Sequence, residues 1–436
     1  MRNKKKIGCV IAYSDNHNNY GTSLQGFATI KKIRDLGYDC EIIRYKKQLT
    51  LFEKIKLIYL MFRCGGTMDK IRIVKERLNM KLHPMYKKNI QERTDAVNEY
   101  KLKRLIPLFH EYVGYEKLCQ GSLNYDVVLV GSDQVWTPLS LYSKYYNLLF
   151  VSDWVPKVAY ASSFGVSIIP SFQHEETKRF LNRFNKIGVR EIRGKEIVET
   201  ISDNQATVVA DPTMLLTREE WQQEIAESDI QEKEPYIFCY FLGTNQEARE
   251  AVSNLKDQTG YKVVTIRHMD EFVPSDDVFG DEAPYNVSPN DFIKYISEAS
   301  YICTDSFHCT VFSIIFQRKF LTFYRFKKHS LTSRNSRIDS LLEYFDLSDR
   351  LYNGDICSIK NNIDYNNDYN NDEYKGTVFI IDQFKRPEEI ELFRVIYQHN
   401  FYLLGVLRDL DYRIQNLIDD ESTKNDLHLI INIDNK

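Results

Sequence analysis

The sequence predicts an α/β protein with two doubly wound, mostly parallel sheets. Apolar runs of strand length alternate with segments of helical periodicity in both halves of the chain. The chain has 436 residues, which is enough for two or three domains of ordinary size. Hydrophobic residues make up 43% of the sequence and charged residues 27%, a composition typical of a folded globular protein.

The first half of the chain predicts strands separated by helices. Strands are predicted at four apolar runs, Ile7–Tyr13, Tyr38–Tyr45, Asp126–Val130 and Lys157–Ala161. Apolar side chains at helical spacing predict a helix over Thr22–Leu36. Gly37 ends this helix, because glycine accepts the left-handed conformation common at a helix terminus.

The second half repeats this alternation. Four more strands are predicted, at Tyr236–Phe241, Lys262–Arg267, Tyr301–Thr304 and Phe320–Tyr324. Helices are predicted at Gln246–Asp257, from the Ser288 cap with Pro289 at the first helical position, and at about 334–344. Ligands of such sheets bind at the carboxyl ends of the strands, here facing a cleft between two domains.

We therefore expect an N-terminal domain at residues 1–205 and a C-terminal domain at residues 206–436, since the two series meet between Gly194 and Trp221. The N-terminal domain contains a helical, basic insertion at about residues 46–120. The C-terminal domain contains an Asn- and Asp-rich segment, 361–374, that predicts a loop. Residues 387–419 predict a long helix.

The N-terminus and the cysteines favour a cytoplasmic protein. The first apolar stretch is short and runs into Asp15 and Asn16, which favours a strand over a signal peptide. No segment approaches the roughly 20 apolar residues that a membrane span needs. The 8 cysteines form no CxxC pair, which argues against a disulfide framework or a zinc site. Neither a metal nor a cofactor is expected.

Basic residues are concentrated near the N-terminus. Residues 1–120 carry 25 Lys and Arg against 12 Asp and Glu, and the remainder carries 33 against 49. Between Lys46 and Arg104, apolar and basic residues at helical spacing permit an amphipathic helix on anionic lipid, at the inner face of the membrane. A helix with a solvated basic face explains the pattern equally well. Nucleic-acid binding is not expected, because no recognised motif accompanies the charge.

The most informative segment is 304–316, TDSFHCTVFSIIF, which joins a predicted buried strand to a predicted buried helix. Asp305, Ser306 and His308 lie at the junction. The N–H groups of a helix N-terminus suit a phosphate or carboxylate, and an imidazole there can exchange a proton with an anionic substrate. An ordinary helix cap or a partly buried core histidine is the alternative interpretation.

Three loops that follow predicted strands carry further polar groups. Asn19 and Gly21 lie in the first loop, Ser132 and Asp133 in the second, and Ser163 in the third. Each alone is more often turn chemistry than a site, but three at equivalent strand ends favour a site. The first loop lacks the second and third glycines of a dinucleotide-binding fingerprint.

Arginines near the domain join are candidates for anion binding. The segment VREIRG contains Arg190 and Arg193, and a guanidinium can hold a carboxylate or phosphate with two hydrogen bonds. The alternative is a structural ion pair, for instance with Asp211. Arg334 and Arg337 could face the same cleft or cap their helix, and both interpretations stay open.

Six segments together resemble the polysaccharide pyruvyl transferase family. In chain order they are NYGTSLQ, YDVVLVGSDQVW, KVAYASSFG, VREIRG, ADPTMLL and TDSFHCTVFSIIF. The set is specific as a whole, although no single piece is. The resemblance implies two Rossmann-like domains in a GT-B-like arrangement. It also implies phosphoenolpyruvate as the donor and a sugar hydroxyl pair as the acceptor, which becomes a cyclic pyruvate ketal.

The resemblance implies roles for two residues: the catalytic histidine of the family falls on His308, and its arginine in the VRE segment falls on Arg190. The chemistry of the residue types suggests the other roles, and Asp305 could orient the imidazole or cap the helix. The donor side would comprise Arg190, Ser306, Cys309, Thr310 and Arg337. The acceptor side would comprise Asn19, Gly21, Ser132, Asp133 and Ser163. Family members often have glycine where this chain has Cys309, a departure that bears on specificity.

The chemistry fits these residue types, since ketal formation from an enol ether requires protonation of the donor methylene carbon. His308 could deliver that proton or stabilise the departing phosphate as an imidazolium. The acceptor sugar could be free or lipid-linked. Two other hypotheses for the function remain: a GT-B glycosyltransferase that uses a nucleotide sugar, and a non-catalytic subunit of a polysaccharide assembly complex.

Overall fold

The computed structural model describes residues 5–15, 19–48, 50, 55, 58–59, 78–267, 272–325 and 335–363. The chain divides into two compact units, Met1–Thr377 and Val378–Lys436, and every described residue belongs to the first. Three predicted features lie outside the described residues: much of the basic insertion, the Asn- and Asp-rich loop beyond residue 363, and the helix at 387–419. Arg334 lies outside them as well.

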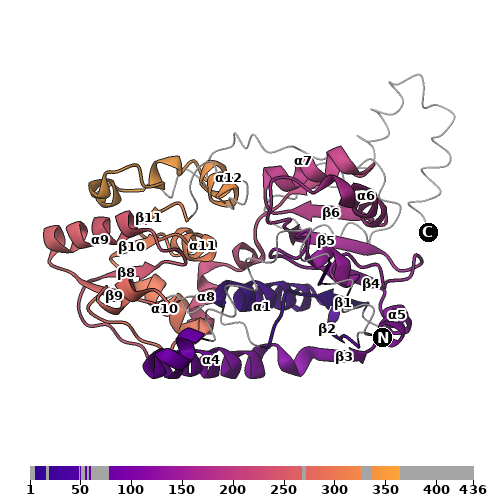
Figure 1. The fold of residues 1–436 in the computed structure, drawn as a ribbon, viewed down its shortest axis with the longest axis horizontal. Coiled ribbons are helices and arrows are strands. Elements are labelled where there is room, and N and C mark those ends of the chain that lie inside the picture. Colours follow the sequence, from indigo (N-terminus) through magenta and orange to yellow (C-terminus); the bar gives the residue numbers. More distant parts are fainter. Residues whose placement is uncertain are drawn as a thin grey trace, which may run out of the picture. The chain divides into compact units, whose positions relative to one another are not determined.

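The first sheet has seven parallel strands in the order β3-β2-β1-β4-β5-β6-β7 (Figure 1). Their bounds are β1 Lys6–Val10, β2 Asp39–Lys46, β3 Phe109–Val113, β4 Val127–Val130, β5 Lys157–Ser162, β6 Lys186–Val189 and β7 Thr207–Val208. In the register, Ile7 of β1 lies opposite Cys40 on one side and Val127 on the other. The strand order reverses between β1 and β4, which is the position where such sheets bind ligands.

Five longer helices accompany this sheet: α1 Tyr20–Asp35, α4 Pro84–Arg104, α5 Tyr115–Gly121, α6 His174–Leu181 and α7 Ile192–Ile201. Helix α1 begins at Asn19, whose side chain accepts a hydrogen bond from the Thr22 backbone N–H at 3.3 Å. It ends just before Gly37, which has a φ of +87°. The buried core beneath the β4 and β5 loops includes Trp136 and Phe164, whose ring centroids are 5.2 Å apart.

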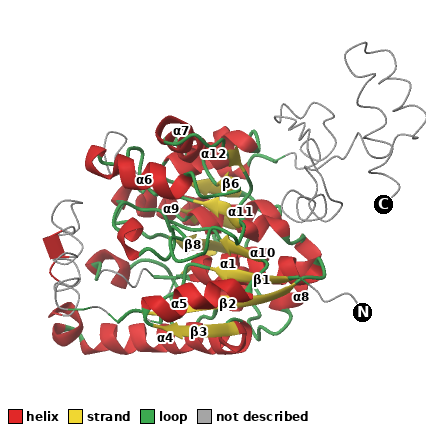
Figure 2. Ribbon diagram, turned by 90° about the vertical axis from the view of Figure 1, so that its right-hand side faces the viewer, coloured by secondary structure: helices red, strands yellow, loops and turns green. Residues whose placement is uncertain are grey.

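The second sheet has four parallel strands in the order β11-β10-β8-β9. They are β8 Tyr236–Tyr240, β9 Lys262–Thr265, β10 Tyr301–Thr304 and β11 Phe320–Thr322. Helices lie on both sides of the stacked strands (Figure 2); those of this half are α8 Arg218–Ile225, α9 Gln246–Thr259, α10 Pro289–Glu298, α11 Phe307–Ile315 and α12 Ser336–Tyr344. Because β10 is an inner strand, the loop that follows it starts from the middle of the sheet.

The two sheets are linked by aromatic and polar contacts of α1. The Tyr20 hydroxyl donates a hydrogen bond to the Val287 carbonyl at 3.0 Å, and its ring stacks on Phe292 at 4.6 Å between centroids. Trp221 of α8 lies between Phe27 of α1 and Phe312 of α11, with centroid distances of 5.9 and 5.0 Å. These contacts bring the first turn of α1 against α10 and connect its second turn to α11 through Trp221.

The predicted α/β fold class with two doubly wound sheets is confirmed, but three strands were missed. The stretch predicted as a helical insertion contains β3, an edge strand on which only Tyr112 is buried, so its pattern is too polar to stand out. Strands β6 and β7 are only 4 and 2 residues long. Strand β7 extends the first sheet to Val208, and the domain division at residue 205 stays a prediction.

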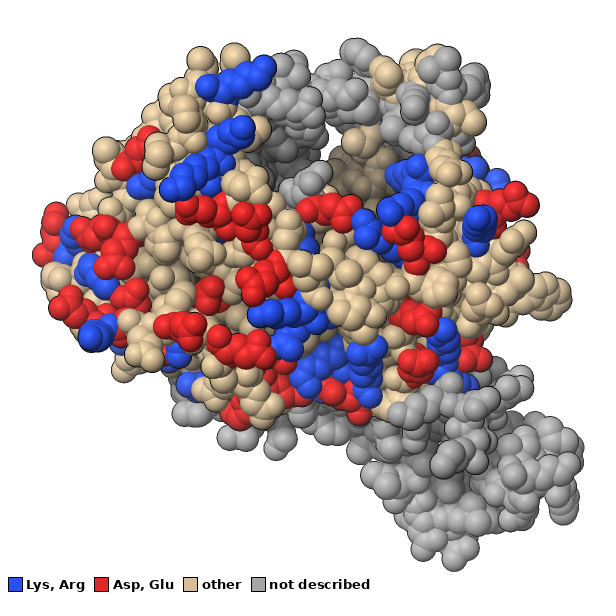
Figure 3. Space-filling model, turned by 90° about the horizontal axis from the view of Figure 1, so that it is seen from below, with Lys and Arg blue, Asp and Glu red and all other residues tan. Residues whose placement is uncertain are grey.

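The described part of the basic region includes α4, several of whose charges are paired. Lys88 pairs with Glu92 at 3.6 Å and Lys103 with Glu99 at 3.0 Å. Basic and acidic side chains are interspersed on the face seen in Figure 3. Among the described residues, no helix has the length and apolar character to cross a membrane. Membrane contact and cytoplasmic location stay predictions.

Candidate active site

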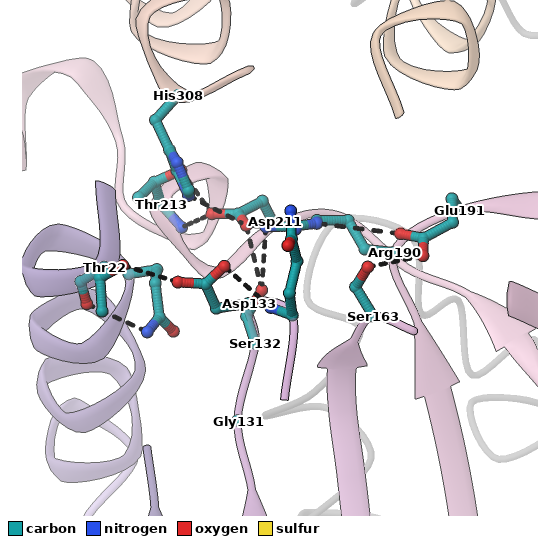
Figure 4. A network of polar contacts seen from close by, with 12 residues as sticks. Thr22, Gly131, Ser132, Asp133, Ser163, Arg190, Glu191, Asp211, Thr213 and His308 are labelled. Carbon is teal, nitrogen blue, oxygen red and sulfur yellow. Dashed lines mark hydrogen bonds and ion pairs between the residues drawn. The ribbon is translucent and has the colours of Figure 1, made fainter. Parts of the chain in front are cut away.

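Polar side chains from several strand ends of the first sheet meet around Asp211 (Figure 4). Asp211 follows β7 and is buried, with 2% of its surface exposed. Its Oδ1 accepts hydrogen bonds from the Thr213 backbone N–H at 3.0 Å and the Thr213 hydroxyl at 2.8 Å. Its Oδ2 accepts from Arg190 Nη1 at 2.9 Å and from the Ser132 hydroxyl at 3.1 Å. Asp211 therefore connects the loops after β4, β6 and β7.

His308 reaches this network from the second sheet. It lies in the first turn of α11, and its Nε2 is 3.6 Å from Asp211 Oδ2. That separation allows electrostatic attraction but is too long for a good hydrogen bond, and Nε2 is buried without a hydrogen-bond partner. The ring packs directly on Gly21 of α1, where a Cβ would come within 2.0 Å of His308 Nδ1. Only glycine at this position of α1 leaves room for the imidazole.

Asp133 forms the side of the network nearest α1. Its Oδ2 accepts a hydrogen bond from the Thr22 hydroxyl at 2.6 Å, and its Oδ1 accepts from the Gln134 backbone N–H at 2.8 Å. Its backbone has a φ of +81°, a left-handed conformation that is uncommon for a non-glycine residue. Such conformations are enriched at functional sites, where neighbouring contacts hold them in place.

Arg190, at the end of β6, is a buried cation with one free edge. Nη1 is held by Asp211, and the ring of Phe307 lies against the guanidinium, with 4.5 Å between Cζ and the ring centroid. Nε and Nη2 are buried and have no hydrogen-bond partner. Buried guanidinium N–H groups without acceptors are unfavourable, so this edge is suited to an anionic or hydroxyl ligand.

Ser163 and Glu191 complete the network next to Arg190. The Ser163 hydroxyl donates a hydrogen bond to Glu191 Oε1 at 2.6 Å. Glu191 Oε2 lies 4.0 Å from Arg190 Nε and has no hydrogen-bond partner. The site thus combines unpartnered donors and an unpartnered acceptor in a buried setting.

The charges of this network perturb one another. Burial by itself raises the pKa of Asp211, but His308 and Arg190, together with the Thr213 N–H, outweigh burial and hold the pKa well below its usual range. Burial likewise opposes the ionisation of Asp133, and Arg190, His308 and Thr22 lower its pKa overall. The pKa of Arg190 is raised, since Asp211, Glu191 and Asp133 offset its desolvation. Asp211 and Asp133 are therefore carboxylates, and Arg190 is a cation.

The residues predicted around His308 on the second sheet are held in other contacts. Asp305 does not orient the imidazole: its two oxygens accept hydrogen bonds from the Leu242 and Gly243 backbone N–H groups at 2.6 and 2.8 Å. The carboxylate facing His308 is Asp211 instead. Ser306 caps α11 by accepting from the Cys309 N–H at 3.5 Å.

Cys309 and Thr310 are buried side chains of α11. Burial raises the pKa of the Cys309 thiol to about 12. The Thr310 hydroxyl donates to the Ser306 carbonyl at 3.1 Å and shares a hydrogen bond with Thr322 at 2.9 Å. Both side chains are fully buried, so they contribute to the packing of α11. Their contacts give no argument for the donor-binding roles expected from the sequence, and these roles stay predictions.

The remaining predicted residues are distributed around the network. Asn19 caps α1, and the guanidinium of Arg337 lies 5.7 Å from the Phe307 ring centroid. Arg193 points away, donating to the Ser167 carbonyl and pairing with Glu196. Sequence reasoning named Asp211 only as an ion-pair partner and omitted Glu191. Two features of the sequence could have identified them: Asp211 stands directly before Pro in ADPTMLL, and Glu191 is an acidic residue directly after Arg190.

The sequence of this network carries a family signature. The family model described as polysaccharide pyruvyl transferase matches residues 19–325, more than half of the chain and every segment of the site. The chain belongs to the polysaccharide pyruvyl transferase family. Membership supports a role in pyruvyl transfer during polysaccharide biosynthesis, with a polysaccharide acceptor. A comparison with curated proteins finds no match.

Solved structures similar to this family member are distant in sequence. UDP-GlcNAc 2-epimerase from Neisseria meningitidis, bound to UDP-GlcNAc, is 9% identical with a TM-score of 0.42, covering 81% of this chain and 89% of its own. E. coli ADP-heptose lps heptosyltransferase II is 10% identical with a TM-score of 0.31, covering 73% and 84%.

Proposed function

We propose that this protein transfers pyruvate from phosphoenolpyruvate to two hydroxyls of a sugar, forming a cyclic ketal and releasing phosphate. One observation carries the proposal: His308, with a buried and unpartnered Nε2, lies within 3.6 Å of Asp211 in a network that also leaves Nε and Nη2 of Arg190 unpartnered. A proton-transfer group and an unoccupied cationic edge are the two elements that an anionic enol ether donor requires.

Arg190 is the proposed anchor of the donor. Its free edge would hold the carboxylate or phosphate, while Asp211 and Phe307 fix the guanidinium in one orientation. The N-terminal turn of α11, which begins next to His308, would add backbone N–H groups toward the phosphate. Support for this arrangement is that Arg190 and His308 both face the same oxygen of Asp211.

His308 is the proposed acid and base. Its imidazolium donates a proton to the donor methylene carbon, which becomes a methyl group while C2 becomes electrophilic. One sugar hydroxyl loses its proton and forms a bond to C2, the bridging C–O bond breaks, and phosphate leaves with the electron pair and takes up that proton. The second hydroxyl then bonds to C2 and returns a proton to His308. General acid–base catalysis of this kind contributes about 10²- to 10⁴-fold to a rate.

Asp211 and Gly21 position the imidazole for this cycle. Asp211 stays ionised beside Arg190 and faces the imidazole of His308 across 3.6 Å. Gly21 lets the ring approach α1, which fixes its orientation from the other side. Asp211 is thus a positioning residue, and its effect passes through His308.

Incubation of the purified protein with phosphoenolpyruvate and a panel of free, aryl-linked and lipid-linked sugars tests the proposal. Phosphate release together with a mass gain corresponding to a pyruvate ketal is the expected result. The comparison of free with lipid-linked acceptors also identifies which form the enzyme uses.

Nucleotide sugars form a second arm of the panel. If the protein releases nucleotide and transfers a glycosyl group from a nucleotide sugar, and releases no phosphate from phosphoenolpyruvate, the protein is a glycosyltransferase and the proposal is wrong. A protein that turns over neither donor, yet supports polysaccharide assembly in cells as a His308→Ala variant, would instead be a non-catalytic subunit.

A further inference from the structure

Glu191 is a buried carboxylate that the reaction above leaves without a role. It is 3% exposed and occupies the N-cap position of α7, but its side chain does not cap that helix. Ser163 holds Oε1 at 2.6 Å, and Oε2 is buried with no hydrogen-bond partner. A buried carboxylate oxygen is rarely left unsatisfied in a folded protein, so a ligand is expected to donate a hydrogen bond to it.

Oε2 forms an ion pair with Arg190 Nε at 4.0 Å, which is too long for a hydrogen bond, and Nε has no hydrogen-bond partner either. The guanidinium cannot readily turn toward Glu191, because Asp211 holds Nη1 at 2.9 Å and Phe307 lies against one face. A single oxygen atom at an ordinary distance of about 2.8 Å from both atoms fits this separation. A ligand group that bridges these two atoms therefore needs one oxygen that donates a hydrogen bond to Oε2 and accepts one from Nε.

The chemistry of the two atoms selects the class of group that fits. Glu191 Oε2 can only accept a hydrogen bond and Arg190 Nε can only donate one. A carboxylate or a fully ionised phosphate lacks a proton to donate and would meet the negative charge of Glu191. A hydroxyl satisfies both atoms. The donor anion is then left with Nη2 on the same guanidinium.

We propose that Glu191 binds one hydroxyl of the acceptor sugar and takes its proton when that hydroxyl attacks the donor, an inference that rests on the proposed function. The acceptor O–H bond breaks and its proton moves to Oε2, while the oxygen forms the new bond to C2. The proton then leaves with the released phosphate. His308 recovers its own proton from the second hydroxyl, so both groups return to their starting state.

Glu191→Gln is the direct test, with Glu196→Gln as the control on the same helix, where the side chain is 52% exposed. Gln keeps the size of the side chain but cannot take up the proton. We expect the transfer rate to fall by about 100-fold, with phosphoenolpyruvate affinity unchanged by calorimetry. Glu196→Gln should match the wild type in both measurements.

Acceptor analogues that lack one hydroxyl give a readout that does not need turnover. Without donor, the wild type should bind the intact acceptor more tightly than one deoxy analogue, and Glu191→Gln should discriminate less between the two, because its neutral amide is a weaker acceptor than the carboxylate. Equal discrimination by wild type and variant would show that Oε2 meets only water and would overturn the inference. Should Glu191→Gln fail to fold, Glu191→Asp, which retains the charge but draws the oxygen back, is expected to fold and lose the same discrimination.

The outcomes separate this inference from the proposed function. A wild type that releases no phosphate with any acceptor removes the proposed function itself. A wild type that forms the ketal, together with a Glu191→Gln variant of equal rate, removes only the role of Glu191.

Discussion

The carboxyl edges of the two sheets are both polar, but they differ in how their polar groups are satisfied. At the first sheet, Arg190 and Glu191 are buried with unpartnered atoms, and the unpartnered His308 Nε2 joins them. At the second sheet, both oxygens of Asp305 accept backbone hydrogen bonds, and the Thr310 hydroxyl is paired with Ser306 and Thr322. The edge of the first sheet therefore has polar groups that can still bind a ligand, whereas the edge of the second sheet uses its polar groups to hold loops.

The carboxyl pKa values differ in the same way. Cations of the network lower the pKa of Asp211 and Asp133, although burial opposes this. Burial raises the pKa of Asp305, and its backbone hydrogen bonds and Arg325 offset this only in part. A strand-end aspartate is therefore informative about function only when its partners are known, because the same residue type stabilises charge at one edge and a loop at the other.

The largest expected effect is that of His308→Ala. Loss of the imidazole should lower the transfer rate by about 10²- to 10⁴-fold, since the proton for the donor methylene then has no source. His110→Ala, at a histidine of β3 whose side chain is 49% exposed, is the control and should keep wild-type activity. Phosphate release under saturating donor measures both. Equal rates for the two variants would place the chemistry elsewhere.

Asp211→Asn tests whether the network at the carboxyl edge of the first sheet depends on the negative charge of Asp211. Removing one partner of a buried ion pair costs about 3 kcal/mol of unfolding free energy, and denaturant titration measures that loss. The transfer rate at saturating donor should fall as well, because the imidazole loses the carboxylate that faces it at 3.6 Å. A stability loss with an unchanged transfer rate would reduce Asp211 to a structural role.

Gly21→Ala should disturb the imidazole without touching its chemistry. The added Cβ would lie 2.0 Å from His308 Nδ1, so the ring must move away from α1 and lose its position beside Asp211. We expect roughly a 10- to 100-fold loss of rate from this misplacement. Gly26→Ala on the same helix is the matched control, since its Cβ meets only the end of the Ile11 side chain, at 3.0 Å. Similar rates for both variants would argue against the close packing of His308 on α1.

Acid should weaken the first edge selectively. The pKa values of Asp211 and Asp133 are lowered in the folded protein, so their stabilisation is present above the usual aspartate range and is lost as pH falls below about 4. Asp133→Asn should therefore be less stable than the wild type near neutral pH, and the gap should narrow as pH decreases. Thermal melts across this range measure it, and a constant gap would contradict the lowered pKa.

Asp305→Asn is expected to have the smallest effect on transfer. The amide keeps one acceptor for the Leu242 and Gly243 N–H groups, so we expect a loss of about 1 kcal/mol in unfolding free energy and a nearly unchanged rate at saturating donor. A rate loss comparable to that of His308→Ala would make Asp305 catalytic and erase the difference between the two edges.

Much of this arrangement could be predicted from the sequence. Apolar runs identified eight of the strand positions, and motifs identified Ser132, Asp133, Ser163, Arg190 and His308 as polar groups at strand ends. The partner of His308 could not be predicted, because Asp305 is near in sequence whereas Asp211 meets the imidazole only when both sheets are folded. Glu191 could not be predicted for a related reason. Its side chain is held through Oε1 by Ser163, which lies 28 positions away in the sequence, and this contact leaves Oε2 without a hydrogen-bond partner.

The most direct test of the central claim is the mass of the product formed from phosphoenolpyruvate and an accepted sugar in D₂O. Protonation of the methylene carbon by His308 predicts a pyruvate ketal whose methyl group carries one deuterium, formed by the wild type and by His110→Ala but not by His308→Ala in the same time. A ketal without deuterium, or equal yields from His308→Ala and the wild type, would contradict the account.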